Sequence, residues 1–302
     1  MNFSINKSFR LLNIYERLNR GEELHKDKLA DDFAVSLKTV QRDIDELRAY
    51  LEQTHFSESD TAIKYDKAKN CYYLIRPEME WMTNEEALAL CKILLESRAF
   101  CKDELSGLID KLIAQVSPYD RSIIKSIIKN ELFNYVPLRH GKKLLNQIWT
   151  LSQHITKQEI ISFKYHRQDG KQSVKIVKPL SIMFSEFYFY LIAFMADESK
   201  NYPIIFRIDR ITEIKNTGEH FTIDYRNKFK DGEFRKRVQF MYAGELKTVK
   251  FEYSGVLEAI LDRLPTAKIL KEVNGVYTIS AETYGDGIYM WLKSQGDMVR
   301  VL

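Results

Sequence analysis

Two runs of apolar residues at helical spacing, separated by a break of four residues, most constrain the fold of the N-terminal part of the chain. The second run repeats at intervals of three, four and three residues, so its members lie along one face of a helix. Ser36 stands directly before this helix, and serine is a favoured N-cap residue. The runs are Leu29, Ala30 and Phe33, then Leu37, Val40, Ile44 and Leu47, with Ala34-Val35-Ser36-Leu37 as the break. The sequence therefore predicts a helix, a tight turn and a second helix here.

The residues on either side extend this pattern. An earlier apolar face predicts a first helix that ends at Arg20-Gly21. Residues 63–66 and 71–74 are typical of two short strands around a basic turn at residues 67–70. The first helical face consists of Phe9, Leu12, Tyr15 and Leu18. Helix, helix, turn, helix and hairpin is the order of a winged helix-turn-helix, which we predict over residues 1–78.

The candidate DNA-binding residues lie opposite the apolar stripe of the third helix and in the basic turn. A helix fits the major groove, where its outward side chains meet base edges and its N-terminus meets phosphate. Lysines in the turn are candidates for contact with phosphate or the minor groove. The candidates are Ser36, Lys38, Thr39, Gln41 and Arg42 on the helix, and Lys67 and Lys69 in the turn. A solvated helix face and a generic basic hairpin are the alternatives.

Residues 29–47 resemble the signature of DeoR-like bacterial regulators. The shared pattern is "LA...VS..T..RDI..L", which here runs from Leu29-Ala30 through Arg42-Asp43-Ile44 to Leu47. Such DNA-reading modules commonly bind two half-sites about one helical turn apart, so a homodimer is expected. Residues 1–78 carry 13 basic and 14 acidic side chains, which predicts modest DNA affinity for a single copy.

Residues 79–140 are expected to form a helical linker or dimerisation region. Thr83-Asn84-Glu85-Glu86 has the pattern of a capping box, and Ser117-Pro118 offers a second helix start with proline at the first helical position. Plain packing within a domain is the alternative for these helices.

From Glu159 onward the apolar pattern changes to a period of two, which indicates strands. About five strands are expected over residues 141–225, in a small antiparallel barrel or sheet with a hairpin turn at Asp169-Gly170. Residues 249–302 show the order strand, helix, strand, strand, helix, strand, which suggests a ferredoxin-like unit within residues 238–302. The predicted fold class is therefore α+β with several domains.

The middle segment resembles the WYL domain. Phe189-Tyr190-Leu191 stands where that family has its Trp-Tyr-Leu triplet, and Phe206-Arg207-Ile208-Asp209-Arg210-Ile211 matches its "FR.DRI" pattern. Lys178-Pro179-Leu180 and the terminal residues 290–302 also resemble the family and its C-terminal extension. The resemblance implies a small β-barrel of the SH3/Sm type that senses an effector, in some members a nucleic acid. Phenylalanine in place of tryptophan at position 189 removes an indole donor.

The candidate effector-binding residues are an aromatic and several basic side chains of this segment. Arginine forks bind phosphate bidentately, and an aromatic ring offers a stacking platform, so the set suits a nucleotide or single-stranded nucleic acid. Residues 139–180 carry nine basic and two acidic side chains, a net charge of +7 that also favours an anionic ligand. The candidates are Tyr190, Arg207 and Arg210, with Lys178, Ser181 and His166 expected nearby. Strict alternation places the two arginines on opposite faces unless the strand ends or bulges near Asp209. Ordinary packing is the alternative for the aromatic residues.

Composition excludes several other classes of protein. The longest apolar stretch, residues 187–195, is too short to span a membrane, and residues 1–10 lack a secretory pattern, so a cytoplasmic location is expected. Cys71, Cys91 and Cys101 lack metal-ligand spacing and are expected to be reduced thiols. No catalytic motif is recognisable, and we expect neither an enzyme nor a bound cofactor or metal.

The function that follows is a homodimeric transcription factor, more specifically a repressor, whose operator binding responds to an anionic nucleotide or nucleic-acid ligand. The alternative is a module that binds single-stranded DNA or RNA and does not regulate a promoter. Proteins of this architecture are associated with phage defence and DNA damage, and nothing in these residues selects such a role.

Overall fold

The computed structural model describes residues 6–54, 62–75, 82–116, 120–222 and 229–302. The chain divides into two compact units, one made of residues 1–96 and 105–135 and the other of residues 97–104 and 136–302. Ser117-Pro118, the expected helix start, lies outside the described residues. No helix within the described ranges is long and apolar enough to cross a membrane.

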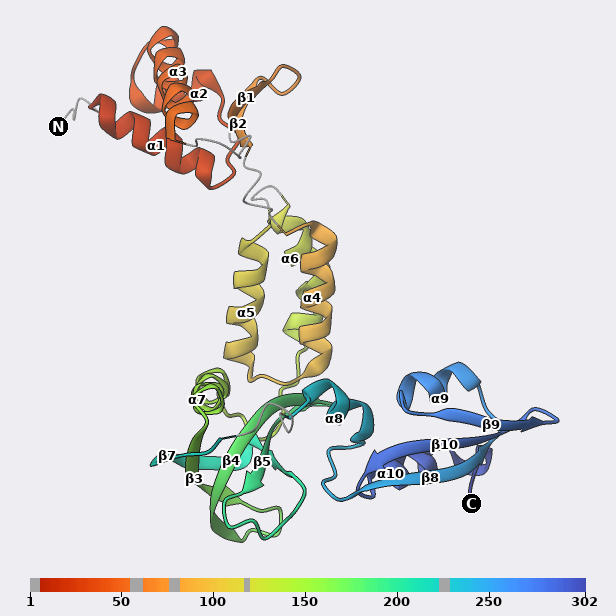
Figure 1. Ribbon diagram of the computed structural model, residues 1–302. Helices are drawn as coiled ribbons and strands as arrows, with labels where there is room; N and C mark the ends of the chain where they lie inside the picture. Colours follow the sequence, from red (N-terminus) through yellow and green to blue (C-terminus); the bar gives the residue numbers. More distant parts are fainter. Residues whose placement is uncertain (1–5, 55–61, 76–81, 117–119, 223–228) are drawn as a thin grey trace. The chain divides into compact units, whose positions relative to one another are not determined.

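The N-terminal elements of the first unit are three helices followed by a hairpin (Figure 1). They are α1 (Lys7–Asn19), α2 (Lys26–Phe33), α3 (Leu37–Thr54), β1 (Ala62–Asp66) and β2 (Cys71–Ile75). Leu24 pairs with Tyr72 through two backbone hydrogen bonds of 2.9 and 2.8 Å, so the segment before α2 joins the hairpin. The predicted order of helix, helix, turn, helix and hairpin is confirmed.

The predicted apolar face of the first helix is wrong in part. Phe9 and Leu12 are 59% and 68% exposed, whereas Ile14 and Leu18 are buried in the core with Val40 and Ile44 of α3. The helix is therefore rotated relative to the predicted face. Leu37, the first residue of the predicted stripe and of α3 itself, is also exposed.

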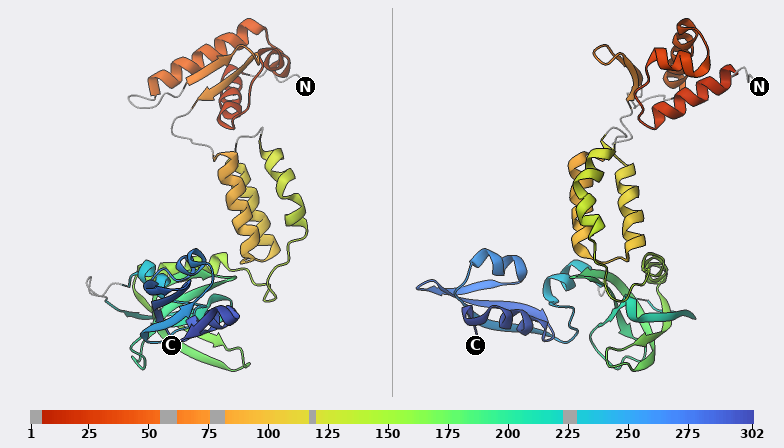
Figure 2. Two further views of the ribbon diagram at one scale, coloured as in Figure 1. Left: turned by 90° about the vertical axis from the view of Figure 1, so that its right-hand side faces the viewer. Right: turned by 180° about the vertical axis from the view of Figure 1, so that it is seen from behind.

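Three antiparallel helices complete the first unit, and they lie side by side in the views of Figures 1 and 2. They are α4 (Asn84–Ser97), α5 (Lys102–Ala114) and α6 (Arg121–Phe133). The predicted capping box is confirmed: the Thr83 amide donates to Glu86 Oε2 at 2.9 Å, and the Glu86 amide donates to Thr83 Oγ1 at 3.2 Å. Each helix has a row of buried residues, which includes Cys91 in α4, Ile109 in α5 and Ile124 in α6.

The second unit begins with a helix and an antiparallel sheet of five strands in the order β6-β5-β4-β3-β7. Its elements are α7 (Leu145–Thr156), β3 (Glu159–His166), β4 (Gln172–Ser185), β5 (Tyr188–Met195), β6 (Ile204–Arg207), a 3₁₀ turn (Ile208–Arg210), β7 (Ile211–His220) and α8 (Asp231–Arg237). Successive residues of β5 enter different cores: Leu191 packs with Leu151 of α7, and Ile192 packs with Phe234 of α8. A helix therefore covers each face of the sheet.

The expected closed barrel is wrong, because the described strands form an open sheet. The edge strands β6 and β7 do not pair with each other within the described residues. β6 has only four residues and gives way at Ile208 to the 3₁₀ turn, which carries the chain to the opposite edge beside β3. The SH3/Sm-like assignment stays a prediction.

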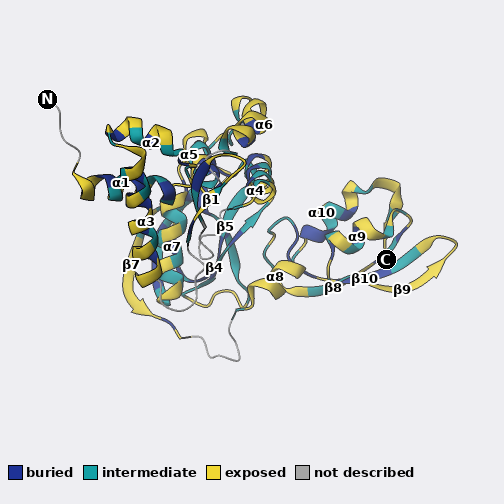
Figure 3. Cartoon of the chain, turned by 90° about the horizontal axis from the view of Figure 1, so that it is seen from above, coloured by how far each residue is buried: buried dark blue, intermediate teal, exposed yellow. Residues whose placement is uncertain are grey.

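The C-terminal elements form a second sheet, in the order β11-β8-β10-β9, with the predicted succession of strands and helices. They are β8 (Leu246–Tyr253), α9 (Leu257–Arg263), β9 (Lys268–Val273), β10 (Val276–Tyr284), α10 (Gly287–Ser294) and β11 (Val299–Val301). Phe251, Ile260, Ile288 and Leu292 are buried between sheet and helices. The edge strand β9 is exposed along its whole length (Figure 3). The ferredoxin-like assignment stays a prediction.

Candidate nucleic-acid interface and ligand site

The N-terminus of α3 is fixed by the residue predicted as its N-cap. Ser36 Oγ accepts a hydrogen bond from the Thr39 amide at 3.1 Å and lies 2.9 Å from Thr39 Oγ1. The preceding turn is tight because Ala34 adopts a left-handed conformation with φ of 51°. The prediction of Ser36 as N-cap is confirmed, and its hydroxyl and that of Thr39 are already engaged with each other.

Replacing Ser36 with alanine is expected to lower the stability of α3 by about 1 kcal/mol, because the Thr39 amide loses its side-chain acceptor and keeps only the backbone oxygen of residue 36. Hydrogen exchange of the first turn of α3 in the full chain measures this change. Ser8→Ala, which removes an exposed hydroxyl from α1, is the matched control and should leave the exchange of α3 unchanged. Equal exchange in the two variants would show that the cap contributes nothing.

The outward face of α3 carries two basic side chains that the domain itself does not use. Lys38 and Arg42 are exposed and have no hydrogen-bond or ion-pair partner among the described residues. Gln41 differs, because its Oε1 accepts from Tyr72 Oη at 2.8 Å and from Lys26 Nζ at 3.0 Å. Gln41 therefore links α3 to the hairpin and to α2, and its role in DNA reading stays a prediction.

The hairpin turn holds one free and one paired lysine. Asp66 Oδ1 accepts from the amides of Ala68 and Lys69 at 2.8 and 3.1 Å, which shapes the turn. Lys67 is exposed and has no partner in the described part of the chain. Lys69 lies 2.7 Å from Glu23, and this carboxylate raises the pKa of Lys69. Of the seven predicted DNA-binding residues, Lys38, Arg42 and Lys67 are thus the free cations.

A buried ion pair that sequence reasoning missed joins α1 to α3. Arg10 Nε donates to Asp43 Oδ2 at 2.8 Å and a terminal nitrogen donates to Oδ1 at 3.2 Å. The side chains are only 10% and 2% exposed, and the hydrogen bond to Asp43 raises the pKa of Arg10. The sequence does contain a sign of this pair. Asp43 lies on the same helical face as Val40 and Leu47, and a charge on an apolar face needs a partner. This pair fixes the orientation of the helix that carries Arg42.

In the second unit, the 3₁₀ turn after β6 organises a cluster of aromatic and charged groups. Arg207 donates to both carboxylate oxygens of Asp209, at 3.0 and 2.8 Å, and Asp209 is only 5% exposed. The guanidinium lies 3.4 Å from the centre of the Tyr188 ring, while Tyr190 stands opposite Arg207 in the strand register. Burial raises the pKa of Tyr190 to about 12, against the charges of Arg207 and Arg210.

Two residues from the loop before α7 approach the same groups. Lys142 Nζ donates to the backbone oxygen of Asp209 at 2.6 Å, and the His140 ring lies 6.5 Å from the Tyr188 ring. Burial lowers the pKa of His140, and its Nε2 has no partner within the described residues. We refer to Tyr188, Tyr190, Arg207, Asp209, Arg210, His140 and Lys142 as the tyrosine–arginine cluster. No local pattern in the sequence predicts a role for His140 or Lys142, because both approach from outside the sheet.

Two known protein families match this chain, one in the N-terminal helical region and one in the region of the five-stranded sheet. A helix-turn-helix (HTH) domain profile matches residues 10–55, and the WYL domain profile matches residues 148–216. The chain joins an HTH domain to a WYL domain. Together these two domains support a DNA-binding regulator, while the DeoR-like assignment stays a prediction.

Two solved structures show similarity to the chain. One is proteasome accessory factor B/C (PafBC) of Arthrobacter aurescens, with 17% identity, a TM-score of 0.30, and coverage of 99% of this chain and 46% of that chain. The other is a CRISPR Cas-related protein, with 12% identity, a TM-score of 0.34, and coverage of 89% and 69%. This chain thus spans about half the length of PafBC. No curated protein sequence matches it.

The WYL domain does not gather all the predicted effector-binding residues. Its strand β6 ends at Arg207, as convergence of the two arginines requires, and Arg210 has no partner among the described residues. Lys178 instead pairs with Glu198 at 2.8 Å and stands opposite Phe194. Ser181 is buried opposite Ile192, and His166 Nε2 lies 2.9 Å from Thr212 Oγ1. The tyrosine–arginine cluster therefore contains Tyr190, Arg207 and Arg210, and the structure gives Lys178, Ser181 and His166 other partners or surroundings.

Proposed function

We propose that this chain is a homodimeric transcriptional repressor that binds operator DNA through α3 and the hairpin. In this proposal an anionic nucleotide or single-stranded nucleic acid at the tyrosine–arginine cluster modulates the binding, and no catalytic step is involved. The observation that carries the proposal is the pair of cations, Lys38 and Arg42, that have no partner among the described residues and lie on the outward face of an HTH recognition helix.

The distribution of acidic residues supports DNA binding despite the net charge of the domain. Asp43 is buried against Arg10, Glu46 lies 2.6 Å from Lys7, and Asp32 lies 3.0 Å from Arg17. These carboxylates are neutralised within the domain, whereas Lys38, Arg42 and Lys67 have no acidic partner in the parts of the domain that the structure describes. A helix inserted in the major groove would meet DNA with uncompensated positive charge.

A dimer follows from the way such helices read DNA. One recognition helix covers only part of a major groove, so two copies related by a two-fold axis are needed to read a palindromic operator with half-sites about 34–36 Å apart. The exposed apolar residues of α4 and α6, such as Ile93 and Ile127, are available for contact between copies.

The chemistry of the tyrosine–arginine cluster supports an anionic ligand. Asp209 already occupies the fork of Arg207, whereas Arg210 has no partner among the described residues and can offer its guanidinium to a phosphate. His140 Nε2 offers a further polar contact. The ligand can change operator affinity only by as much as its affinity differs between the two conformations of the protein.

Arg210→Ala is expected to weaken the response to the ligand about tenfold or more, because a charge-assisted hydrogen bond to the anion is lost. Operator complexes are titrated with a short single-stranded oligodeoxynucleotide and with ribonucleoside monophosphates, and release of the duplex is measured by gel shift. Lys175→Ala, a half-buried basic residue of β4 outside the cluster, is the control and should respond as wild type. A wild-type response in the Arg210 variant would show that the ligand binds elsewhere.

A further inference from the structure

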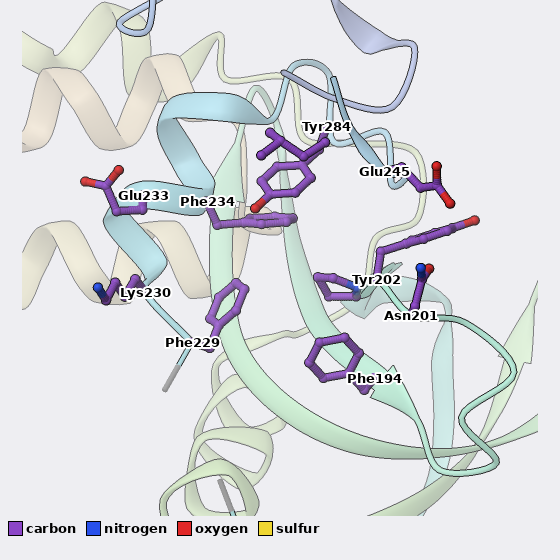
Figure 4. Close-up of a pocket in the computed structure, with 11 residues that line it drawn as sticks. Phe194, Asn201, Tyr202, Phe229, Lys230, Glu233, Phe234, Glu245 and Tyr284 are labelled. Atoms are coloured by element: carbon purple, nitrogen blue, oxygen red, sulfur yellow. The ribbon is translucent and has the colours of Figure 1, made fainter. Parts of the chain in front are cut away.

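A cavity of about 670 Å³ in the second unit shares no lining residue with the tyrosine–arginine cluster. It is formed by the end of β5, the loop that follows, α8 and its preceding residues, and the ends of β8 and β10. Figure 4 shows the lining side chains gathered around a hollow. Its volume lies within the range of roughly 300–1,000 Å³ that is typical of small-molecule sites.

Aromatic rings dominate the wall of this cavity. Phe194, Tyr202, Phe229, Phe234 and Tyr284 line it, whereas among the described lining residues Pro203 and Leu246 contribute the aliphatic side chains. Phe234 is buried and packs against two of the other rings. The centre of its ring lies 5.2 Å from that of Phe229 and 4.9 Å from that of Tyr284. In Figure 4 the rings of Phe194, Phe229 and Phe234 surround the hollow on different sides. Such a wall favours a flat aromatic ligand over an alkyl chain.

The charges at the cavity balance one another. Glu233 is held by Arg237 and Lys236, each at 2.7 Å, and these cations lower its pKa to about 2. Of the remaining charged lining groups, Lys230 and Glu245 have no ion-pair partner in the described part of the chain. One ammonium and one carboxylate leave no net charge. An aromatic cage for an ammonium ligand would instead need an excess of negative charge.

We propose that this aromatic pocket binds the base of a nucleoside. The rings stack on the faces of the base, as aromatic side chains do in single-stranded nucleic-acid sites. Asn201 and Glu245, which Figure 4 shows beside Tyr202 at one end of the hollow, supply an amide and a carboxylate for the hydrogen-bonding edge of the base. The WYL sheet and the C-terminal sheet both contribute to the wall, so a bound base contacts both.

Isothermal titration of the full-length protein with adenosine, guanosine, cytidine and uridine tests the proposal. At least one nucleoside is expected to bind wild type, and Phe229→Ala should weaken its binding about tenfold. Tyr202→Ala, on the loop before β6, is a second variant that does not depend on the core around α8 and should weaken binding in the same direction.

The controls separate this pocket from other sites. Trp149→Ala removes an aromatic ring that is 65% exposed on α7 and should bind the nucleoside as wild type does. Arg210→Ala should also keep nucleoside affinity, so failure of the effector site and failure of this pocket are distinguishable. Binding of choline in place of every nucleoside, absence of nucleoside binding, or unchanged affinity in both pocket variants would overturn the proposal.

Discussion

Replacing Asp43 with alanine is expected to lower the local stability of the HTH domain by about 3–5 kcal/mol. The change leaves the Arg10 guanidinium buried without the carboxylate that now accepts two of its hydrogen bonds. Because this pair connects α1 to α3, both helices should exchange their amide hydrogens faster. The exchange of α4, α5 and α6 in the same chain should not change. Hydrogen-exchange mass spectrometry of the full-length protein measures all five helices at once.

The matched control is Glu46→Ala, which removes a second ion pair between the same two helices. Lys7 and Glu46 are 55% and 45% exposed, so their pair is screened by solvent and its loss should cost no more than about 1 kcal/mol. Replacing both buried partners, with Arg10→Met and Asp43→Leu, should recover much of the lost stability because no unpaired charge remains. Equal protection in the Asp43 and Glu46 variants would contradict the structural role of the buried pair.

Arg42→Ala is expected to weaken binding to the operator by about 1–3 kcal/mol, or roughly five- to 150-fold. The side chain is exposed on α3 and has no partner within the described residues, so the substitution removes a DNA contact without breaking an internal one. Fluorescence anisotropy with a labelled duplex measures the affinity. Lys38→Ala should act in the same direction.

Arg20→Ala is the control for charge alone. Arg20 is 66% exposed at the end of α1 and pairs with Glu16, away from the recognition helix. The substitution Arg20→Ala removes the same unit of charge from the same domain as Arg42→Ala. It should change the affinity for the operator far less. Equal losses in the two variants would mean that only net charge matters, and that α3 does not read the duplex.

The sequence predicted those parts of the fold that depend on local pattern. The spacing of Leu29, Phe33, Val40 and Ile44, with Ser36 as a cap, was enough to place the helices and the turn of the HTH domain. The alternation after Glu159 likewise predicted the strands of the WYL domain. In both regions the spacing that predicts each helix or strand is set by residues close together in the sequence.

The features that were wrong or missed depend on residues far apart in the sequence. Phe9 and Leu12 suited a helical face, but the position of α3 decides which side of α1 is buried. Closure of the barrel depends on where the short strand β6 ends, which alternation does not reveal. His140 and Lys142 reach the tyrosine–arginine cluster from the loop before α7, and no periodic signal links them to Asp209.

Gln41 and Arg207 show a second reason why sequence alone did not predict the candidate sites fully. Both are residue types that contact nucleic acid, and both make internal interactions that sequence alone does not show. Gln41 joins α3 to the hairpin through Tyr72, and Arg207 is held by Asp209. Their neighbours Arg42 and Arg210 have no such partners among the described residues. Whether such a residue has a structural or a binding role therefore depends on its contacts in the folded protein.

The central claim is that the chain is a sequence-specific DNA-binding regulator. Its most direct test is the equilibrium binding of the full-length protein to the duplex upstream of its own gene, compared with a scrambled duplex of equal length at the same salt concentration. We predict binding at least about a thousandfold tighter to the native duplex, with a protected region that contains two half-sites about one helical turn apart. Equal affinity for the two duplexes, with tighter binding to single-stranded DNA or RNA, would contradict this account and favour a module that binds single strands.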